Sequence, residues 1–235
     1  MISDKAIIDK NFKIESSIQV GPFSVISKDV KIGKNTKIHS HVVITGDTNI
    51  SEDCEIYSFA SIGSNPQDLK FKGEKTKLII GKKNKIREYV TINPGTAHGG
   101  GLTTIGDNCL FMISSHVAHD CKIGNNVILA NNVALAGHVE IDDNVIIGGN
   151  SAVQQFTRIG KFAMIGGMTG VEKDVIPFGL ATGNRSHLEG INIIGLKRAG
   201  YSNDEINALN EAVKLIFSND ILNKSCSNDV LYNLK

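Results

Sequence analysis

The stretch VGPFSVISKDVKIGKNTKIHSHVVI, from Val20 to Ile44, carries a valine or an isoleucine at every sixth position. The same spacing begins at Ile8 and continues to Ile62, resumes at Ile80, and runs again from Ile105 to Val171 after a shift of one residue. Neither the 3.6-residue period of a helix nor the alternation of an ordinary strand produces a strict period of six. A hexapeptide repeat is typical of a parallel β-helix.

Three hexads make one triangular coil of 18 residues, with the recurring aliphatic side chain inside. Coils stack at the strand spacing of about 4.8 Å, so residues 18 apart in sequence become vertical neighbours. Glycine often follows the inward residue, as at Gly33 and Gly124, and we expect these glycines at sharp corners where a Cβ would be crowded. The repeat therefore predicts an all-β solenoid over residues 1–176.

Two segments interrupt the repeat, and interruptions of a solenoid often carry function. Residues 64–77 keep the six-residue phase but lose the aliphatic positions, which indicates an extended loop. Residues 93–104 break the phase by one and contain the triplet Gly99–Gly101, which predicts a turn or a mobile flap.

The repeat ends near Val175, and residues 177–235 form the second predicted region. An irregular segment comes first. Ser202 and Glu205 then form a capping-box pattern, which predicts the start of a helix. The apolar face of this helix consists of Ile206, Leu209, Val213 and Ile216. It is expected to pack on the solenoid or on a neighbouring subunit. Residues 218–235 allow one more short helix.

Composition narrows the class of protein. The formal net charge of the 235 residues is +1, which argues against a nucleic-acid partner. Four cysteines show no metal-ligand spacing, so we expect reduced thiols. The sequence has neither a signal-peptide pattern nor a long apolar run, so we expect no membrane span.

Ionisable residues gather in SSHVAHDC, from Ser114 to Cys121, and in AGHV, which contains His138. The spacing of 18 places His119 in one vertical column with Gly137 and Gln155. It also stacks Asp120 with His138 in the next column. With His116, these side chains form a candidate site, because clustered ionisable groups mark functional sites.

The sequence resembles the acyl-acyl carrier protein–UDP-N-acetylglucosamine O-acyltransferases of lipid A biosynthesis. The matching segments are NPQDLKF, REYVTINPGTAHGGGLTTIG, SSHVAHDCKIGNNVILANNVALAGHVEI, GGNSAVQQF and INIIGLKRAG. The resemblance implies a cytoplasmic homotrimer of left-handed parallel β-helices with active sites between neighbouring subunits. It implies the first step of lipid A biosynthesis, with no metal and no cofactor beyond the phosphopantetheine thioester of acyl carrier protein.

By this resemblance, a 3-hydroxyacyl chain moves to the 3-hydroxyl of the sugar of UDP-N-acetylglucosamine. His119 matches the general base, Asp120 the carboxylate that supports it, and Gly137 the backbone donor to the oxyanion. Gly167 matches the residue that limits the length of the acyl chain, and a glycine there predicts a long chain. Substrate contacts match Asp68, Lys70, His116, His138 and Gln155, and nucleotide contacts match Asn192 and Arg198.

The chain departs from the family pattern at Ile194 and Ala199, where some members carry glutamate and arginine. Its C-terminal helical region is also shorter than usual, so the sequence does not identify the surface on which acyl carrier protein would dock. Three alternatives stand beside the acyltransferase. One is a γ-class carbonic anhydrase with zinc on His116, His119 and His138. Another is a different hexapeptide transferase, including one that acylates a 3-amino sugar. The third is a noncatalytic scaffold.

Overall fold

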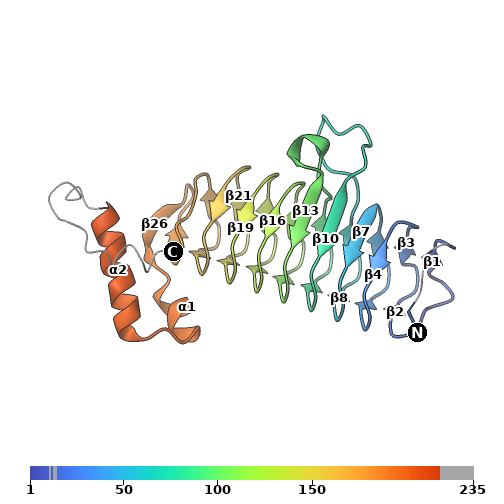
Figure 1. Ribbon diagram of the computed structural model, residues 1–235, viewed down its shortest axis with the longest axis horizontal. Coiled ribbons are helices and arrows are strands. Elements are labelled where there is room, and N and C mark those ends of the chain that lie inside the picture. Colours follow the sequence, from blue (N-terminus) through green and yellow to red (C-terminus); the bar gives the residue numbers. More distant parts are fainter. Residues whose placement is uncertain (11, 13–14, 218–235) are drawn as a thin grey trace.

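The computed structural model describes residues 1–10, 12 and 15–217. They form an elongated parallel β-helix, with its first coil at the N-terminal end and a small helical region at the other (Figure 1). The strands of successive coils stack into three sheets, one on each side of the prism. The predicted solenoid is therefore present, and its coils place distant segments of sequence on one face.

Sheet A contains β2 (Gln19–Val20), β5 (Lys37–Ile38), β8 (Glu55–Ile56), β11 (Lys85–Ile86), β14 (Leu110–Phe111), β17 (Ile128–Leu129), β20 (Ile146–Ile147), β23 (Met164–Ile165), β25 (Gly179–Thr182) and β26 (His187–Ile191). Sheet B contains β1 (Ile7–Ile8), β3 (Val25–Ile26), β6 (Val43–Ile44), β9 (Ser61–Ile62), β12 (Thr91–Ile92), β15 (His116–Val117), β18 (Ala134–Leu135), β21 (Ala152–Val153) and β24 (Gly170–Val171). Sheet C contains β4 (Lys31–Ile32), β7 (Asp47–Ile50), β10 (Lys77–Ile80), β13 (Leu102–Ile105), β16 (Lys122–Ile123), β19 (Glu140–Ile141) and β22 (Arg158–Ile159).

The register of the sheets explains the phase of the repeat. A regular coil pairs residues 18 apart, as in Gln19 with Lys37. Ser61 instead pairs with Thr91, 30 residues on, which is an insertion of 12, or two hexads. Thr91 pairs with His116, 25 residues on, which is an insertion of seven. Twelve extra residues keep the six-residue phase and seven shift it by one, as the sequence shows.

The repeated aliphatic side chains fill the interior. Ile44, Ile62, Leu129 and Leu135 are fully buried, and burial of each such side chain stabilises the fold by about 1.5–3 kcal/mol. One continuous apolar core runs through the coils. Ile8, in the first coil, is only partly buried because it has neighbours on one side alone, and Ile14 lies outside the described residues.

The sharp bends of the backbone do not lie at the glycines, where the sequence had predicted them. The left-handed backbone falls three residues after the inward side chain, at residues such as Asn126 (φ 57°) and Asn144 (φ 62°). Gly124 needs no positive φ; a Cβ there would lie 2.8 Å from the backbone nitrogen of Asp143 in the next coil. The crowding at these glycines was predicted correctly, but the sharp bend belongs to other residues.

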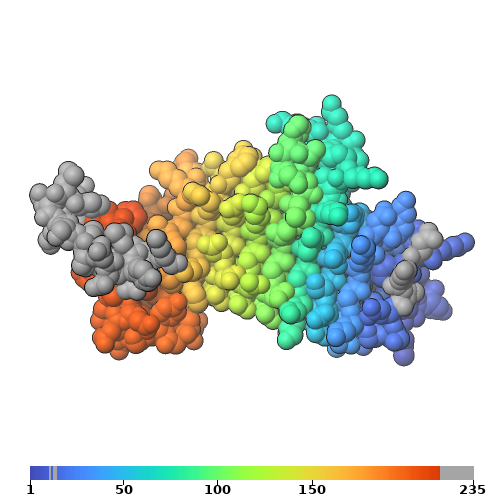
Figure 2. Space-filling model, in the orientation of Figure 1, coloured from blue at the N-terminus to red at the C-terminus, as the bar shows by residue number. Residues whose placement is uncertain are grey.

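Both insertions project from the prism next to one another (Figures 1 and 2). The Ala97 N–H donates to Oε1 of Glu74 at 3.2 Å, and Nδ2 of Asn93 donates to the Ser64 carbonyl at 3.0 Å. The second insertion contains the short 3₁₀ helix η1 (Ala97–Gly99) and ends in a turn at Gly100 and Gly101, both with positive φ. Lys77 and residues 102–104, predicted as loop, belong to strands β10 and β13.

The C-terminal region closes the last coil. β25, which lies beyond the predicted end of the β-helix at residue 176, still pairs in parallel with β23 and forms an antiparallel hairpin with β26. Helices α1 (Ile193–Arg198) and α2 (Asn203–Phe217) follow. The predicted capping box is confirmed, since the Glu205 carboxylate accepts from the Ser202 N–H at 2.8 Å.

Helix α2 packs against its own chain. Its apolar face joins an apolar cluster formed by Phe178, Ile191, Leu196, Ile206, Leu209 and Val213. The predicted stripe is therefore confirmed apart from Ile216, which is 41% exposed. The further helix predicted within residues 218–235 lies outside the described residues.

The described residues contain no helix long and apolar enough to cross a membrane. Cys54, Cys109 and Cys121 are buried and unpaired, as expected, and Cys226 lies outside the described residues.

Candidate active site

His119 and Asp120 form a hydrogen-bonded pair at the corner between sheets B and C. The corner begins after β15, and Asp120 takes the left-handed conformation (φ 59°), which His138 and Phe156 repeat in the next two coils. Nδ1 of His119 lies 2.8 Å from Oδ2 of Asp120. An ionised carboxylate only accepts hydrogen bonds, so Nδ1 carries the proton, and in the neutral imidazole Nε2 keeps its lone pair. The imidazole is thereby prepared to accept a proton at Nε2.

The Asp120 carboxylate is almost completely buried, with 1% of its side chain exposed. The Thr96 N–H donates to Oδ1 at 2.9 Å, and the Thr96 hydroxyl donates to Oδ2 at 2.6 Å. The Asp120 N–H donates to the hydroxyl of Thr103 at 2.8 Å. Burying a carboxylate is unfavourable unless donors replace water, and Thr96 and His119 supply these donors.

Gly137 lies one coil beyond His119, as the spacing of 18 predicts. A Cβ on Gly137 would lie 2.5 Å from Cε1 and 2.7 Å from Nε2 of His119. No oxygen among the described residues accepts a hydrogen bond from the Gly137 N–H. The glycine therefore admits the imidazole and leaves a backbone donor beside it.

His138 occupies the same corner position as Asp120, one coil further on (φ 64°). Its Nε2 lies 3.9 Å from Oδ2 of Asp120, and its ring stacks on Phe156 with centroids 4.4 Å apart. The ring also meets that of His119 edge-on, with centroids 5.1 Å apart. The predicted stacking of Asp120 with His138 is confirmed.

His116 points outward from β15, and its Nδ1 lies 2.7 Å from the hydroxyl oxygen of Thr91. Burial lowers the pKa of His116, and the neighbouring His119 ring, when it carries a proton, lowers that pKa further. The neutral imidazole of His116 is therefore favoured near neutral pH.

His116, His119 and Gly137 border a pocket of about 380 Å³ on the outer surface of sheet B. Small side chains on the neighbouring coils leave this space open. Its lining comprises Gln67, His116, Ala118, His119, Ala134, Leu135, Ala136, Gly137, Ala152 and Val153. Gln67 was not among the predicted site residues, although it adjoins Asp68 in the motif NPQDLKF.

The other predicted substrate contacts, Asp68, Lys70 and Gln155, are not among the residues that line this pocket. Asp68 and Lys70 share the first insertion with Gln67, and Oδ1 of Asp68 accepts from the Lys70 N–H at 3.0 Å. Lys70 is exposed, and neither residue lines the pocket. Gln155 is exposed in the coil beyond Gly137.

Gly167 lies in the last coils of the β-helix, and Asn192 and Arg198 lie at the two ends of helix α1. Oδ1 of Asn192 accepts from the Gly195 N–H at 3.0 Å, and its Nδ2 donates to the Phe162 carbonyl at 3.0 Å. Asn192 thus caps α1, a structural role. Arg198 is the exposed last residue of α1. In the described part of the chain, no hydrogen bond joins these residues to the histidine cluster.

His119, Asp120 and His138 are also the group whose potential metal ligands approach one another, within 4.8 Å, in the described part of the chain. Oδ2 of Asp120, however, already accepts hydrogen bonds from Thr96 and His119. These bonds make His119 and Asp120 a hydrogen-bonded acid–base pair, while His138 lies 3.9 Å from the same oxygen.

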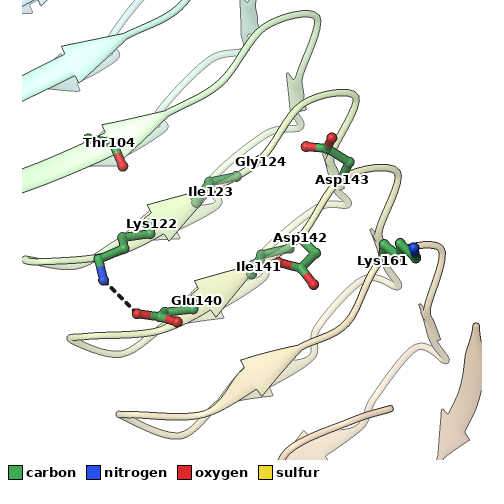
Figure 3. Close-up of a pocket in the computed structure, with 9 residues that line it drawn as sticks. All are labelled: Thr104, Lys122, Ile123, Gly124, Glu140, Ile141, Asp142, Asp143 and Lys161. Atoms are coloured by element: carbon green, nitrogen blue, oxygen red, sulfur yellow. Dashed lines mark hydrogen bonds and ion pairs between the residues drawn. The ribbon is translucent and has the colours of Figure 1, made fainter. Parts of the chain in front are cut away.

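A second hollow, of about 410 Å³, lies on sheet C (Figure 3). Nζ of Lys122 pairs with Oε1 of Glu140 at 2.7 Å, and Asp142, Asp143 and Lys161 complete its charged border. The hollow contains no histidine or other residue of the cluster, and its opposite charges face solvent. We assign the chemistry to the pocket on sheet B.

The fold and the histidine–carboxylate group define a transferase of the hexapeptide-repeat class. The family model described as bacterial transferase hexapeptide (six repeats) matches residues 3–46, 102–137 and 121–155. The model described as UDP N-acetylglucosamine O-acyltransferase, domain 2, matches residues 174–230. The chain belongs to the acyl-acyl carrier protein–UDP-N-acetylglucosamine O-acyltransferase family.

Two relatives and one solved structure illustrate this membership. The enzyme of that name from Paraburkholderia phymatum is 45% identical over 220 residues, which cover 94% of this chain and 84% of the relative. The one from Paracoccus denitrificans is 54% identical over 153 residues, covering 65% of this chain, and the match spans 59% of the relative's length. LpxA from Acinetobacter baumannii has a TM-score of 0.91 at 44% identity, covering 99% of this chain and 90% of that chain. The left-handed parallel β-helix with a C-terminal helical region is thereby confirmed.

Proposed function

We propose that this protein transfers a 3-hydroxyacyl chain from acyl carrier protein to the 3-hydroxyl of UDP-N-acetylglucosamine, the first step of lipid A biosynthesis. The observation that carries the proposal is the geometry of His119. Asp120 holds Nδ1 at 2.8 Å, while Nε2 lies beside the pocket and the Gly137 backbone. Membership of the family identifies the reaction for which this geometry is suited.

The mechanism follows from these atoms. A sugar hydroxyl is a poor nucleophile at neutral pH, so Nε2 of His119 removes its proton as the oxygen attacks the thioester carbonyl. The negative charge of Asp120 stabilises the imidazolium that forms. The carbonyl oxygen becomes an oxyanion, to which the Gly137 N–H donates a hydrogen bond. When the intermediate collapses, the C–S bond breaks and the phosphopantetheine sulfur takes the proton from His119.

Each group supplies part of the rate acceleration. A positioned general base contributes about 10²–10⁴ in rate, and one oxyanion donor about 10²–10³ in kcat.

We assign Asp68, Lys70, His116, His138 and Gln155 to the sugar and acyl groups, as the resemblance implies. Asn192 and Arg198 are assigned to the nucleotide, where the fork of the Arg198 guanidinium suits a diphosphate.

The pocket lies on the outside of the prism, so one chain alone leaves it open to water. We infer that a neighbouring subunit closes it in a cyclic homotrimer. The outward side chains of sheets A and C support this inference, because sheet A offers a neighbouring subunit an apolar surface and sheet C does not. From Leu110 to Met164 the outward column of sheet A is apolar, with Ile128 and Ile146 between them. On sheet C the corresponding column of Lys122, Glu140 and Arg158 is charged.

An acyl-transfer assay tests the reaction. Purified protein is incubated with 3-hydroxymyristoyl-acyl carrier protein and either UDP-N-acetylglucosamine or its 3-amino analogue. The proposal expects an ester that mild alkali cleaves, formed from the 3-hydroxyl sugar. An alkali-stable amide from the 3-amino sugar alone would identify the amide-forming transferase instead. Light scattering of the same sample tests the trimer, and location in the cytoplasm stays a prediction.

A further inference from the structure

Thr96 contacts both oxygens of the Asp120 carboxylate, although 24 residues separate the two in sequence. Its N–H donates to Oδ1 and its hydroxyl donates to Oδ2, the same oxygen that accepts from Nδ1 of His119. Thr96 is 1% exposed and Asp120 is 4% exposed. This two-point contact is internal to the protein and leaves Thr96 no direct access to a substrate.

The two hydrogen bonds from Thr96 fix the rotation of the Asp120 carboxylate about its last bond. The terminal torsion of an aspartate is broad, because its last bond joins tetrahedral and planar carbons. A single bond from His119 would hold one oxygen and let the carboxylate plane turn. With donors on both Oδ1 and Oδ2, the plane is set, and Oδ2 stays where Nδ1 of His119 reaches it.

The seven-residue insertion is built around this carboxylate. The Thr96 carbonyl accepts from the N–H groups of Gly99 at 3.0 Å and Gly101 at 2.8 Å, which close the turn. A Cβ on Gly99 would overlap the Asp120 carboxyl group. The glycine triplet therefore lets the insertion wrap tightly over Asp120 and brings Thr96 to it.

We propose that Thr96 is a positioning residue for the acyl transfer: it holds the Asp120 carboxylate in the orientation that keeps Nε2 of His119 unprotonated. This role rests on the proposed function, in which His119 is the general base. Thr96 acts through Asp120, so its removal lowers the rate of the chemical step and leaves substrate affinity nearly unchanged.

The test compares Thr96→Val, which keeps the shape and the N–H but loses the hydroxyl, with Thr96→Ser, which keeps the hydroxyl. Thr36→Val is the matched control. Thr36 is equally buried, and its hydroxyl donates to the Ser51 carbonyl at 3.1 Å, in the N-terminal coils. We expect Thr96→Val to lower kcat by about 10–100-fold, as removal of an outer partner of a functional group does. KM changes by less than about twofold, because the contact is not made with substrate.

Thr96→Ser is expected to restore most of kcat, and Thr36→Val to leave kcat unchanged even where it lowers the melting temperature. In an Asp120→Asn background, Thr96→Val should have almost no further effect, since residues that act as a unit are not additive. Equal loss of kcat in Thr96→Ser and Thr96→Val, or full additivity with Asp120→Asn, would overturn the proposal.

A second readout does not depend on the reaction. Nitrogen-15 NMR of the His119 ring is expected to show the Nδ1–H tautomer in the wild-type protein and a mixture of tautomers in Thr96→Val. An unchanged tautomer would contradict the positioning role. Absence of acyl transfer by the wild-type protein would count against the proposed function, while the NMR comparison would still decide the role of Thr96.

Discussion

The imidazole of His119 lies directly against the backbone of Gly137, so that a Cβ on this glycine would come 2.5 Å from Cε1. The two residues are 18 apart and face each other only because the coils stack in register. The same contact puts a backbone N–H next to the base. One glycine thereby determines both where the proton acceptor lies and where an oxyanion can be bound.

Gly137→Ala is expected to displace the His119 ring. Kinetics should show kcat lower by about 10²-fold, and denaturant unfolding should show a loss of about 1–3 kcal/mol, the usual result of overpacking. The same substitution in a His119→Ala background is the control, because no ring is left to displace there. Wild-type kcat in Gly137→Ala would contradict the assignment of Gly137.

His116 predicts a dependence of stability on pH. Burial, and to a smaller extent the nearby His119 ring when it is protonated, lowers the pKa of folded His116. The unfolded chain, with a histidine pKa of about 6.5, then binds a proton that the folded chain does not. Stability therefore falls as pH drops through this value.

Urea unfolding at about pH 7.5 and about pH 5.5 measures this fall. His116→Asn should show a smaller loss of stability between the two values than the wild-type protein. His187→Asn, at an exposed position of β26, is the control. An identical loss in wild type and His116→Asn would show that His116 does not contribute.

Gly167 predicts the choice of acyl chain. Its φ is not in the left-handed region, and a Cβ would meet nothing closer than the Gly149 carbonyl oxygen at 3.3 Å. A side chain there therefore requires the Gly149 backbone to shift by a few tenths of an ångström. Gly167→Met is expected to shift preference toward shorter donors by at least about tenfold in relative kcat/KM, since each excluded methylene loses about 0.8 kcal/mol. A competition assay with mixed donors measures this, and an unchanged ranking would remove Gly167 from the acyl site.

The buried thiols should be inert in the folded protein. Burial raises the pKa of Cys54 and Cys109 to about 11 and that of Cys121 to about 12. Little thiolate is present near neutral pH, and thiolate is the reactive form. In Cys226→Ser protein, a chromogenic disulfide reagent should react rapidly only after denaturant is added. Rapid reaction without denaturant would show that one of these thiols is accessible.

The parts of the molecule that obey the six-residue repeat were predictable from the sequence. A strict period of six fixes which side chains point inward, and the spacing of 18 brought His119 to Gly137 and Asp120 to His138. The insertions escape this rule because they have no period and thus no register. The contact of Thr96 with Asp120, the approach of Gln67 to the pocket, and the β25–β26 hairpin could not be derived. The capping role of Asn192 could not be predicted either, because it depends on the residue at which α1 begins.

The most direct test of the account is the initial rate of acyl transfer from 3-hydroxymyristoyl-acyl carrier protein to UDP-N-acetylglucosamine by wild-type protein and His119→Ala. If His119 is the general base, the rate of the variant at saturating substrate falls by about 10²–10⁴ while its melting temperature stays close to that of the wild type. A folded His119→Ala protein with a rate within about threefold of wild type would contradict the role of His119, because a positioned base contributes far more than that.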